Sequence, residues 1–142
     1  MQRTNKYYEL NKILSYLTND EVLKLIKPVD KTRKGWGVNS IVTINRSKIF
    51  VKAVPVAKLF AENSFNSSNL YNLPASYNYG IGSAGCNPWR ELLLCIKTTN
   101  YVLQNKYDSF PLLYHYRIVE DDNYYFETGL NVNLLVFCQR IR

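Results

Sequence analysis

Lys52 is the residue of this sequence that most clearly requires a charged partner. It lies in the segment 48–56, which is rich in β-branched residues and predicts a strand. Alternation places Phe50 on the face of Lys52, and the opposite face then carries Ile49, Val51 and Ala53. An ammonium group on an apolar strand costs desolvation energy unless an anion compensates it. A phosphate or a carboxylate would do so, whereas a lysine at the rim of the sheet would extend its amine into water.

Glu91 is the first carboxylate candidate for the partner of Lys52. It lies early in the segment 88–104, where apolar residues recur at helical spacing. A carboxylate in the first turn of a helix is also stabilised by the helix dipole, so this position has a purely structural explanation as well. Glu62 is a second candidate, only ten residues after Lys52, but the segment around it shows little periodicity.

Two glycines precede the predicted strands in a pattern that could hold a phosphate. Residues 35–42 have the pattern G-x-G-x-x-S-x-V, formed by Gly35, Gly37, Ser40 and Val42. Glycines let a backbone turn sharply and bring its N–H groups close to a phosphate. The pattern leads into a strand and is not followed by Gly-Lys-Ser/Thr, so it is neither a dinucleotide fingerprint nor a Walker A loop. Two interpretations of this segment remain. It is either a phosphate-covering loop between two antiparallel strands or a plain hairpin turn.

The first half of the chain predicts two helices and a hairpin. Apolar residues recur at helical spacing over residues 4–27. Thr18 and Glu21 fit a capping box, so a second short helix starts there. A polar, basic linker at 28–34 separates the helices from the strands 38–44 and 48–56 of the hairpin.

The second half predicts a long loop, one helix and further strands. Residues 60–88 are rich in Asn, Ser, Gly, Tyr and Pro, and a loop of this length is usually functional or mobile. The helix 88–104 follows, with strand candidates at 110–119 and 124–127 and an apolar run at 134–138. The expected architecture is an antiparallel sheet with helices packed against it, which is the α+β class.

Composition and charge restrict the class of protein. The 142 residues make one ordinary domain, and the 46% of apolar residues suits a globular chain with a core. No apolar run is long enough for a transmembrane helix, and three cysteines without a CxxC pair argue against a zinc site or a disulfide scaffold. We therefore expect a cytoplasmic protein without a membrane partner. Residues 1–60 hold 12 Lys or Arg against 4 Asp or Glu, so this half could attract phosphates or form a solvated helix face.

Six segments carry a resemblance to a known family. They are 49–55 (IFVKAVP), 69–74 (NLYNLP), 79–85 (YGIGSAG), 89–91 (WRE), 97–103 (KTTNYVL) and 110–117 (FPLLYHYR). Over residues 35–119 the chain resembles the N-terminal lobe of the protein-kinase superfamily, and more narrowly a bacterial family of kinase-like proteins. The resemblance implies a kinase N-lobe-like antiparallel sheet with a packed αC-type helix, preceded by an N-terminal helical hairpin.

The resemblance also implies roles for single residues and a division of the chain. The residues that would contact ATP are Gly35, Gly37, Ser40 and Val42 of the phosphate-covering loop, the anchoring Lys52, and its helix partner Glu91. The implied parts are an N-terminal helical segment at 1–28, a kinase-like domain at 35–128 with its long loop 60–88, and a C-terminal tail at 129–142.

Departures from the family pattern restrict the implied activity. Ser40 replaces the third loop glycine, and Phe50 stands where kinases carry a small alanine beneath the adenine, so the base pocket is altered or filled. No H-R-D-like loop and no D-F-G follow Arg117, so the base and the magnesium ligands of kinases are missing. The expectation is a truncated kinase-like protein with an ATP half-site, inactive alone or part of a split kinase. A second chain with the catalytic lobe would then supply the magnesium ligands.

The other residues suited to chemistry form no recognisable site. His115 lies in an aromatic strand segment, which favours a packed core residue over a base. Cys86 has no histidine nearby in sequence, and Asp121–Asp122 predicts a solvated turn rather than a metal site. The alternative function is a non-enzymatic binding module whose basic face and 12 tyrosines contact protein or nucleic acid. Nucleic acid is less favoured, because no RNA-binding consensus occurs.

Overall fold

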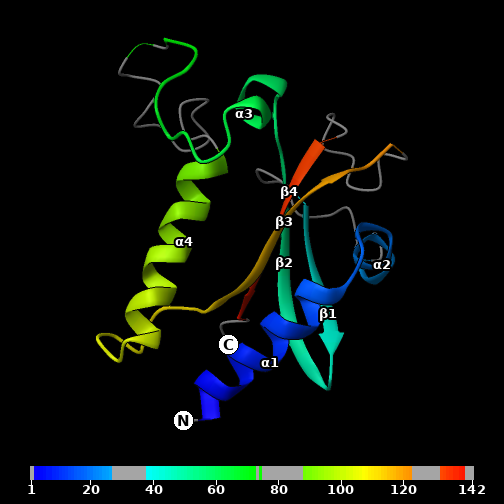
Figure 1. Ribbon diagram of the computed structural model, residues 1–142, viewed down its shortest axis with the longest axis vertical. Helices are drawn as coiled ribbons and strands as arrows, with labels where there is room; N and C mark the ends of the chain where they lie inside the picture. Colours follow the sequence, from blue (N-terminus) through cyan, green and yellow to red (C-terminus); the bar gives the residue numbers. More distant parts are fainter. Residues whose placement is uncertain (1, 27–37, 73, 75–87, 123–131, 140–142) are drawn as a thin grey trace.

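A computed structural model describes residues 2–26, 38–72, 74, 88–122 and 132–139 of the chain (Figure 1). The elements in these ranges are, in chain order, α1 (Gln2–Tyr16), α2 (Asn19–Leu25), β1 (Val38–Ile44), β2 (Ser47–Pro55), α3 (Lys58–Glu62), α4 (Pro88–Leu103), β3 (Leu113–Glu120) and β4 (Val132–Gln139). The strands form one antiparallel sheet with the order β1-β2-β4-β3. The α+β class predicted from the sequence is confirmed.

The first two helices follow from an apolar stripe and a capping signal. Leu10 and Leu14 of α1 are buried in the core. Three further residues of the stripe pack against the same cluster: Tyr7, Ile13 and Leu17. The Thr18 hydroxyl accepts a hydrogen bond from the Glu21 N–H, and the Glu21 carboxylate accepts one from the Thr18 N–H. These two bonds satisfy free N–H groups at the start of α2. The hydrogen bonds that the Glu21 carboxylate accepts from the Thr18 N–H and from the Thr18 hydroxyl lower the pKa of Glu21.

β1 and β2 form the hairpin expected from the change to β-branched residues. Its two-residue turn consists of Asn45 and Arg46, whose φ angles are 45° and 62°. Positive φ at both turn residues matches the right-handed twist of the flanking strands. The Asn45 amide also donates a hydrogen bond to the Glu9 carboxylate over 3.0 Å. The turn sets the register in which Ile44 pairs with Ser47.

The C-terminal segment differs from the tail predicted at residues 129–142. Residues 132–139 form β4, which lies between β2 and β3 in the sheet (Figure 1). Its consecutive residues from Leu134 to Phe137 are all buried. A strand that is covered on both faces shows a continuous apolar run instead of alternation, so the sequence pattern alone does not identify it as a strand.

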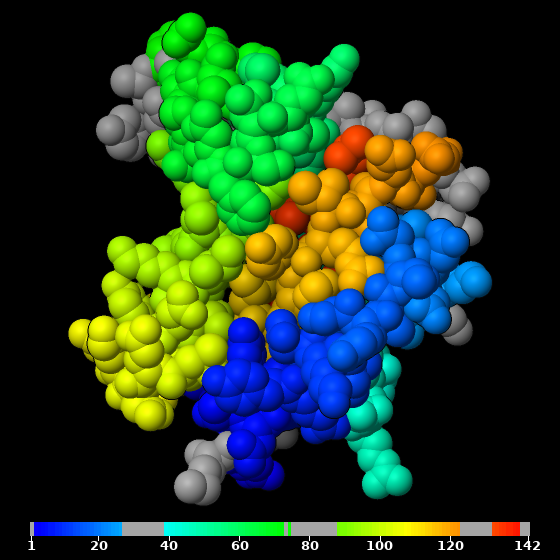
Figure 2. Space-filling view, in the orientation of Figure 1, coloured from blue at the N-terminus to red at the C-terminus, as the bar shows by residue number. Residues whose placement is uncertain are grey.

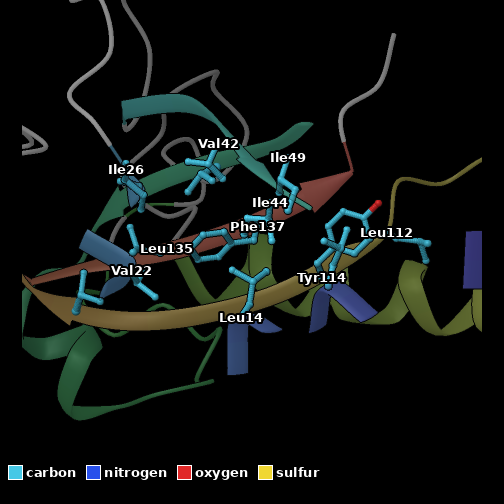
Figure 3. Close-up of a cluster of buried hydrophobic side chains, with 14 of the residues drawn as sticks. Leu14, Val22, Ile26, Val42, Ile44, Ile49, Leu112, Tyr114, Leu135 and Phe137 are labelled. Atoms are coloured by element: carbon cyan, nitrogen blue, oxygen red, sulfur yellow. The ribbon is translucent and has the colours of Figure 1, made fainter. Parts of the chain in front are cut away.

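Helices cover both faces of the sheet. The α1–α2 face carries the first apolar cluster, and Figure 3 shows members from the helices and the strands, among them Leu14, Val22, Val42, Ile49 and Phe137. The α4 face carries the second cluster, which includes Val54, Leu92, Leu134 and Val136. Side chains alternate along a strand, so neighbouring residues of β2 and of β4 belong to different clusters. The two faces of the sheet therefore bury different residues of the same strands.

α4 is anchored to the rest of the fold near both of its ends. Trp89 is fully buried, and its indole N–H donates a hydrogen bond to the Phe60 carbonyl oxygen over 2.8 Å. The buried Thr99 hydroxyl accepts a hydrogen bond from the Leu113 N–H at the start of β3, also over 2.8 Å. Figure 2 shows β3 at the surface between α4 and the N-terminal helices. These contacts set the position of α4, and hence of Glu91, relative to the sheet.

Parts of the predicted organisation lie outside the described residues. These are the linker at 28–34, Gly35, Gly37, residues 73 and 75–87 of the long loop 60–88, and the strand candidate at 124–127. At the start of that loop, residues 58–62 form the short helix α3, which the sequence pattern did not predict. No helix in the described ranges is long and apolar enough to cross a membrane.

Candidate functional site

Lys52 and Glu91 form an ion pair between the sheet and α4. The Lys52 ammonium lies 2.7 Å from Oε1 and 2.8 Å from Oε2 of Glu91, so it donates to both carboxylate oxygens. The sequence predicted that these two side chains would meet, and this geometry is confirmed. The Lys52 side chain keeps 24% of its surface exposed and the Glu91 side chain keeps 44%, so a dissolved anion can reach the pair.

Strand alternation and helix packing bring the two charges together. On β2, Ile49 and Val51 are completely buried on the α1–α2 face, which directs Lys52 toward α4. On α4, Leu92 is buried against the sheet, and Glu91 precedes it in the first turn of the helix. The pairing is therefore a consequence of two apolar patterns, one with the period of a strand and one with the period of a helix.

The ion pair lies over the inner strands of the sheet. Lys52 is opposite Val136 of β4 on one side and opposite Asn39 of β1 on the other. Val136 is buried, so the aliphatic stem of Lys52 has an apolar neighbour while its amine stays partly exposed. Phe50 lies on the same face, two residues earlier on β2, and is half-buried. One face of the sheet thus combines a cation, a carboxylate and an aromatic ring.

Asn39 is a polar residue of this face that the sequence analysis did not single out. It lies directly opposite Lys52 in the register of β1 and β2. Its amide oxygen is buried and has no hydrogen-bond partner among the described residues. Buried amide oxygens are normally paired, so a hydrogen-bond donor at this position would be favourable. The register of the hairpin was the available signal, because it places residue 39 across from residue 52.

The side chains of Ser40 and Val42, two residues of the predicted phosphate-covering loop, do not share the face of Lys52. In β1, Ser40 pairs with Val51 and Val42 pairs with Ile49. Both residues are buried with 4% exposure, and Figure 3 shows Val42 within the first apolar cluster. Side chains that are paired across a hairpin lie on the same face, so both residues point toward α1 and α2. An anion held by Lys52 on the α4 face cannot contact their side chains.

Two further candidates are explained by structural contacts. The Oε1 atom of Glu62 lies 3.7 Å from the Nζ atom of Lys58 in the same helix. This ion pair gives Glu62 a structural role that does not involve Lys52. His115 packs near the Phe137 ring on the α1–α2 face. Burial, with a contribution from the Arg117 cation, lowers the pKa of His115 to about 4. The imidazole is therefore neutral at pH 7, in agreement with the packed role expected for it.

The acidic turn after β3 differs from its prediction. Asp121 is 1% exposed rather than solvated, whereas Asp122 is exposed. Asp121 follows Val119 by two residues and so continues the buried side of the strand. Across the described parts of the chain, no group of three or more His, Cys, Asp or Glu residues could hold a metal ion. Cys86 lies outside those parts.

Comparison of the chain with family models, with curated proteins and with solved structures finds no match.

Proposed function

We propose that the chain binds the phosphate groups of a nucleotide, with ATP as the first candidate, and that Lys52 anchors them. The observation that carries the proposal is the contact of the Lys52 ammonium with both carboxylate oxygens of Glu91, at 2.7 and 2.8 Å. In protein kinases, a strand lysine binds the nucleotide phosphates and forms an ion pair with a helix glutamate. The proposal gives Lys52 and Glu91 these two roles.

Electrostatics and conformational entropy support a phosphate at this position. A lysine side chain has many rotamers, and the contact with Glu91 restricts them before any ligand arrives. Less entropy is then lost when a phosphate binds. The ammonium group is a compact charge with several donors, so it can contact a phosphate oxygen while it keeps a bond to the carboxylate.

The phosphate end of ATP fits these residues better than the adenine end. Phe50 lies on the same face as Lys52 and is half-buried there. In the kinase-like arrangement a small alanine leaves room for the base at this position, and a phenylalanine ring fills part of that room. We expect Phe50→Ala to strengthen binding of an ATP analogue relative to inorganic triphosphate, because only the former carries a base.

Phosphoryl transfer needs groups beyond this ion pair. A base must accept the proton of the attacking hydroxyl, and magnesium ions must neutralise charge on the phosphates. In the proposal, a second chain with a kinase-like catalytic lobe supplies the base and the magnesium ligands. The contribution of this chain is to bind and orient the phosphates through Lys52.

The proposal is tested by titrating the full chain with a non-hydrolysable ATP analogue, with and without magnesium, and following amide shifts by NMR. We expect a dissociation constant on the order of 0.1–1 mM, because a half-site buries little ligand surface. The largest shifts should occur at Lys52, Asn39 and Glu91. Lys52→Met should weaken binding about tenfold, since it removes a charge-assisted hydrogen bond.

Lys48→Met is the matched control, because Lys48 is an exposed lysine of the same strand. Its affinity for the analogue should stay unchanged. Equal losses from the two variants would show general attraction of anions to a basic surface and would contradict the proposal. Single-stranded DNA is the competitor: tighter binding of DNA, with shifts at Lys6 and Lys12 of α1, would favour the binding-module alternative instead.

A further inference from the structure

Two cysteines lie beside the Lys52–Glu91 pair, where α4 packs against β4. Cys95 follows Glu91 by four residues, so it lies one helical turn further on the same side of α4. Cys138 follows Val136, the strand partner of Lys52, by two residues, so it lies on the same face of the sheet. The two cysteines therefore form a second link between this helix and the sheet.

Both thiols are free, and both lie at the margin of the second apolar cluster. Each is half-buried and packs against the buried residues of that cluster. A close side-chain interaction joins the two thiols. It holds the pKa of Cys95 below its ordinary value, and it raises the pKa of Cys138 together with burial. Cys95 is thus the thiol that ionises first, and Cys138 is the one that keeps its proton.

We propose that Cys95 and Cys138 form a redox-modification site, a dithiol that a low-molecular-weight disulfide of the glutathione class converts into an intramolecular disulfide. The inference stands on two free thiols, one on α4 and one on β4, that pack against the same apolar cluster and interact with each other. Both are partly exposed and hence reachable by a small reagent. It does not depend on nucleotide binding.

The reaction is a thiol–disulfide exchange in two steps. The Cys95 thiolate attacks one sulfur of the small disulfide, whose S–S bond breaks and releases one small thiolate. Cys138 then gives its proton to solvent and attacks the Cys95 sulfur of the mixed disulfide, which releases the second small thiolate. The protein loses two electrons and two protons in total. The small disulfide gains them and becomes two thiols, and an excess of that thiol reverses the sequence.

The disulfide would connect α4 covalently to β4 within one helical turn of Glu91. A helix tied to the sheet at this point holds Glu91 within reach of Lys52. The new bond also closes a loop from residue 95 to residue 138, which reduces the conformational entropy of the unfolded chain. We expect the oxidised protein to melt several degrees above the reduced protein.

The experiment uses the full chain with Cys86→Ser, which removes the third thiol, in buffers of increasing ratio of oxidised to reduced glutathione. Peptide mapping should find a Cys95–Cys138 cross-link, and two free thiols should disappear together. The same protein in urea should need a ratio about tenfold higher for half oxidation, because unfolding removes the proximity of the thiols. Mapping of the unmodified chain in parallel keeps the test valid if Cys86→Ser impairs folding.

Single variants test the order of attack. Cys138→Ser should stop at a mixed disulfide on Cys95, and Cys95→Ser should react at Cys138 about tenfold more slowly. Mixed disulfides on both cysteines of the intact pair, with no cross-link at any ratio, would overturn the proposal. Equal half-oxidation ratios for the folded and the urea-unfolded chain would overturn it as well, and faster reaction at Cys138 would contradict the assigned order.

Discussion

The Lys52 ammonium contacts both carboxylate oxygens of Glu91 across the space between β2 and α4. The contact joins a strand held within the sheet to a helix whose own anchors are Trp89 and Thr99. Because the strand is fixed on both sides by its neighbours, the ion pair reports on the docking of the helix. Its strength can therefore be measured in the absence of any ligand.

A double-mutant cycle of Lys52→Met and Glu91→Gln measures this strength. The side chains are 24% and 44% exposed, so we expect about 0.5–1 kcal/mol of coupling in the free energy of unfolding, measured with urea. High salt should weaken it. The matched control is Lys58–Glu62, at 3.7 Å with side chains 89% and 58% exposed, and its coupling should stay below about 0.5 kcal/mol. Equal coupling in the two pairs would show that the Lys52–Glu91 geometry has no special stability.

Arg117 closes the C-terminal end of α1, and its loss should destabilise the fold. Its guanidinium donates hydrogen bonds to the carbonyl oxygens of Leu14 and Leu17, the former over 3.0 Å. Such carbonyl groups lack partners within the helix, and a cation near them also favours the helix dipole. We expect Arg117→Met to lower the free energy of unfolding by about 2 kcal/mol in urea titrations.

The control for Arg117 is Lys97→Met, which removes an exposed cation from α4. That substitution should change the free energy of unfolding by less than about 0.5 kcal/mol. If both variants lose the same amount, the helix-end contacts of Arg117 contribute nothing beyond its charge.

Stability should decrease as the pH falls from 6.5 to 4, in part because of His115. Burial and the Arg117 cation lower the pKa of His115 to about 4 in the folded chain, below its ordinary value of 6.5. In that window the unfolded chain binds a proton that the folded chain does not. The contribution of His115 to the free energy of unfolding is therefore fully present above pH 6.5 and is lost as the pH falls toward 4. The side chain is only partly buried, and solvent screening reduces the effect to about 1–2 kcal/mol.

The His115 effect is isolated by comparing the wild type with His115→Gln in urea titrations at several pH values. Carboxyl groups that titrate in the same range affect both proteins alike. The stability advantage of the wild type should shrink as the pH falls. Parallel pH profiles of the two proteins would mean that His115 has the same pKa in the folded and the unfolded chain.

Trp89 should be a major determinant of how α4 docks. Its indole N–H donates to the Phe60 carbonyl oxygen, and its ring lies 5.3 Å from that of Phe65. Trp89→Phe removes the donor, leaves the carbonyl without this partner and creates a void, so we expect a loss of about 2–4 kcal/mol in thermal or urea unfolding. Tyr71→Phe, which alters an exposed aromatic residue, is the control. A loss below about 1 kcal/mol for Trp89→Phe would show that the site relaxes around the smaller ring.

Local signals in the sequence were sufficient to predict most of the described elements. The capping box of Thr18 and Glu21, the change to β-branched residues at 38–44 and the helical spacing after Pro88 each involve residues a few positions apart. Such patterns act through the backbone of one segment, so they need no knowledge of the partner. The meeting of Lys52 and Glu91 was expected on a different ground, the resemblance to kinases, in which a strand lysine pairs with a helix glutamate.

The tertiary structure alone decided which segments became neighbours and on which face of the sheet each side chain lies. Residues 132–139 lack alternation because both of their faces are buried, so their place between β2 and β3 depends on contacts with strands far away in the chain. Ser40 and Val42 follow the glycine pattern in sequence, yet the register of the hairpin turns them away from Lys52. Cys95 and Cys138 meet only because α4 packs on β4, and no spacing within the sequence encodes a contact that packing creates.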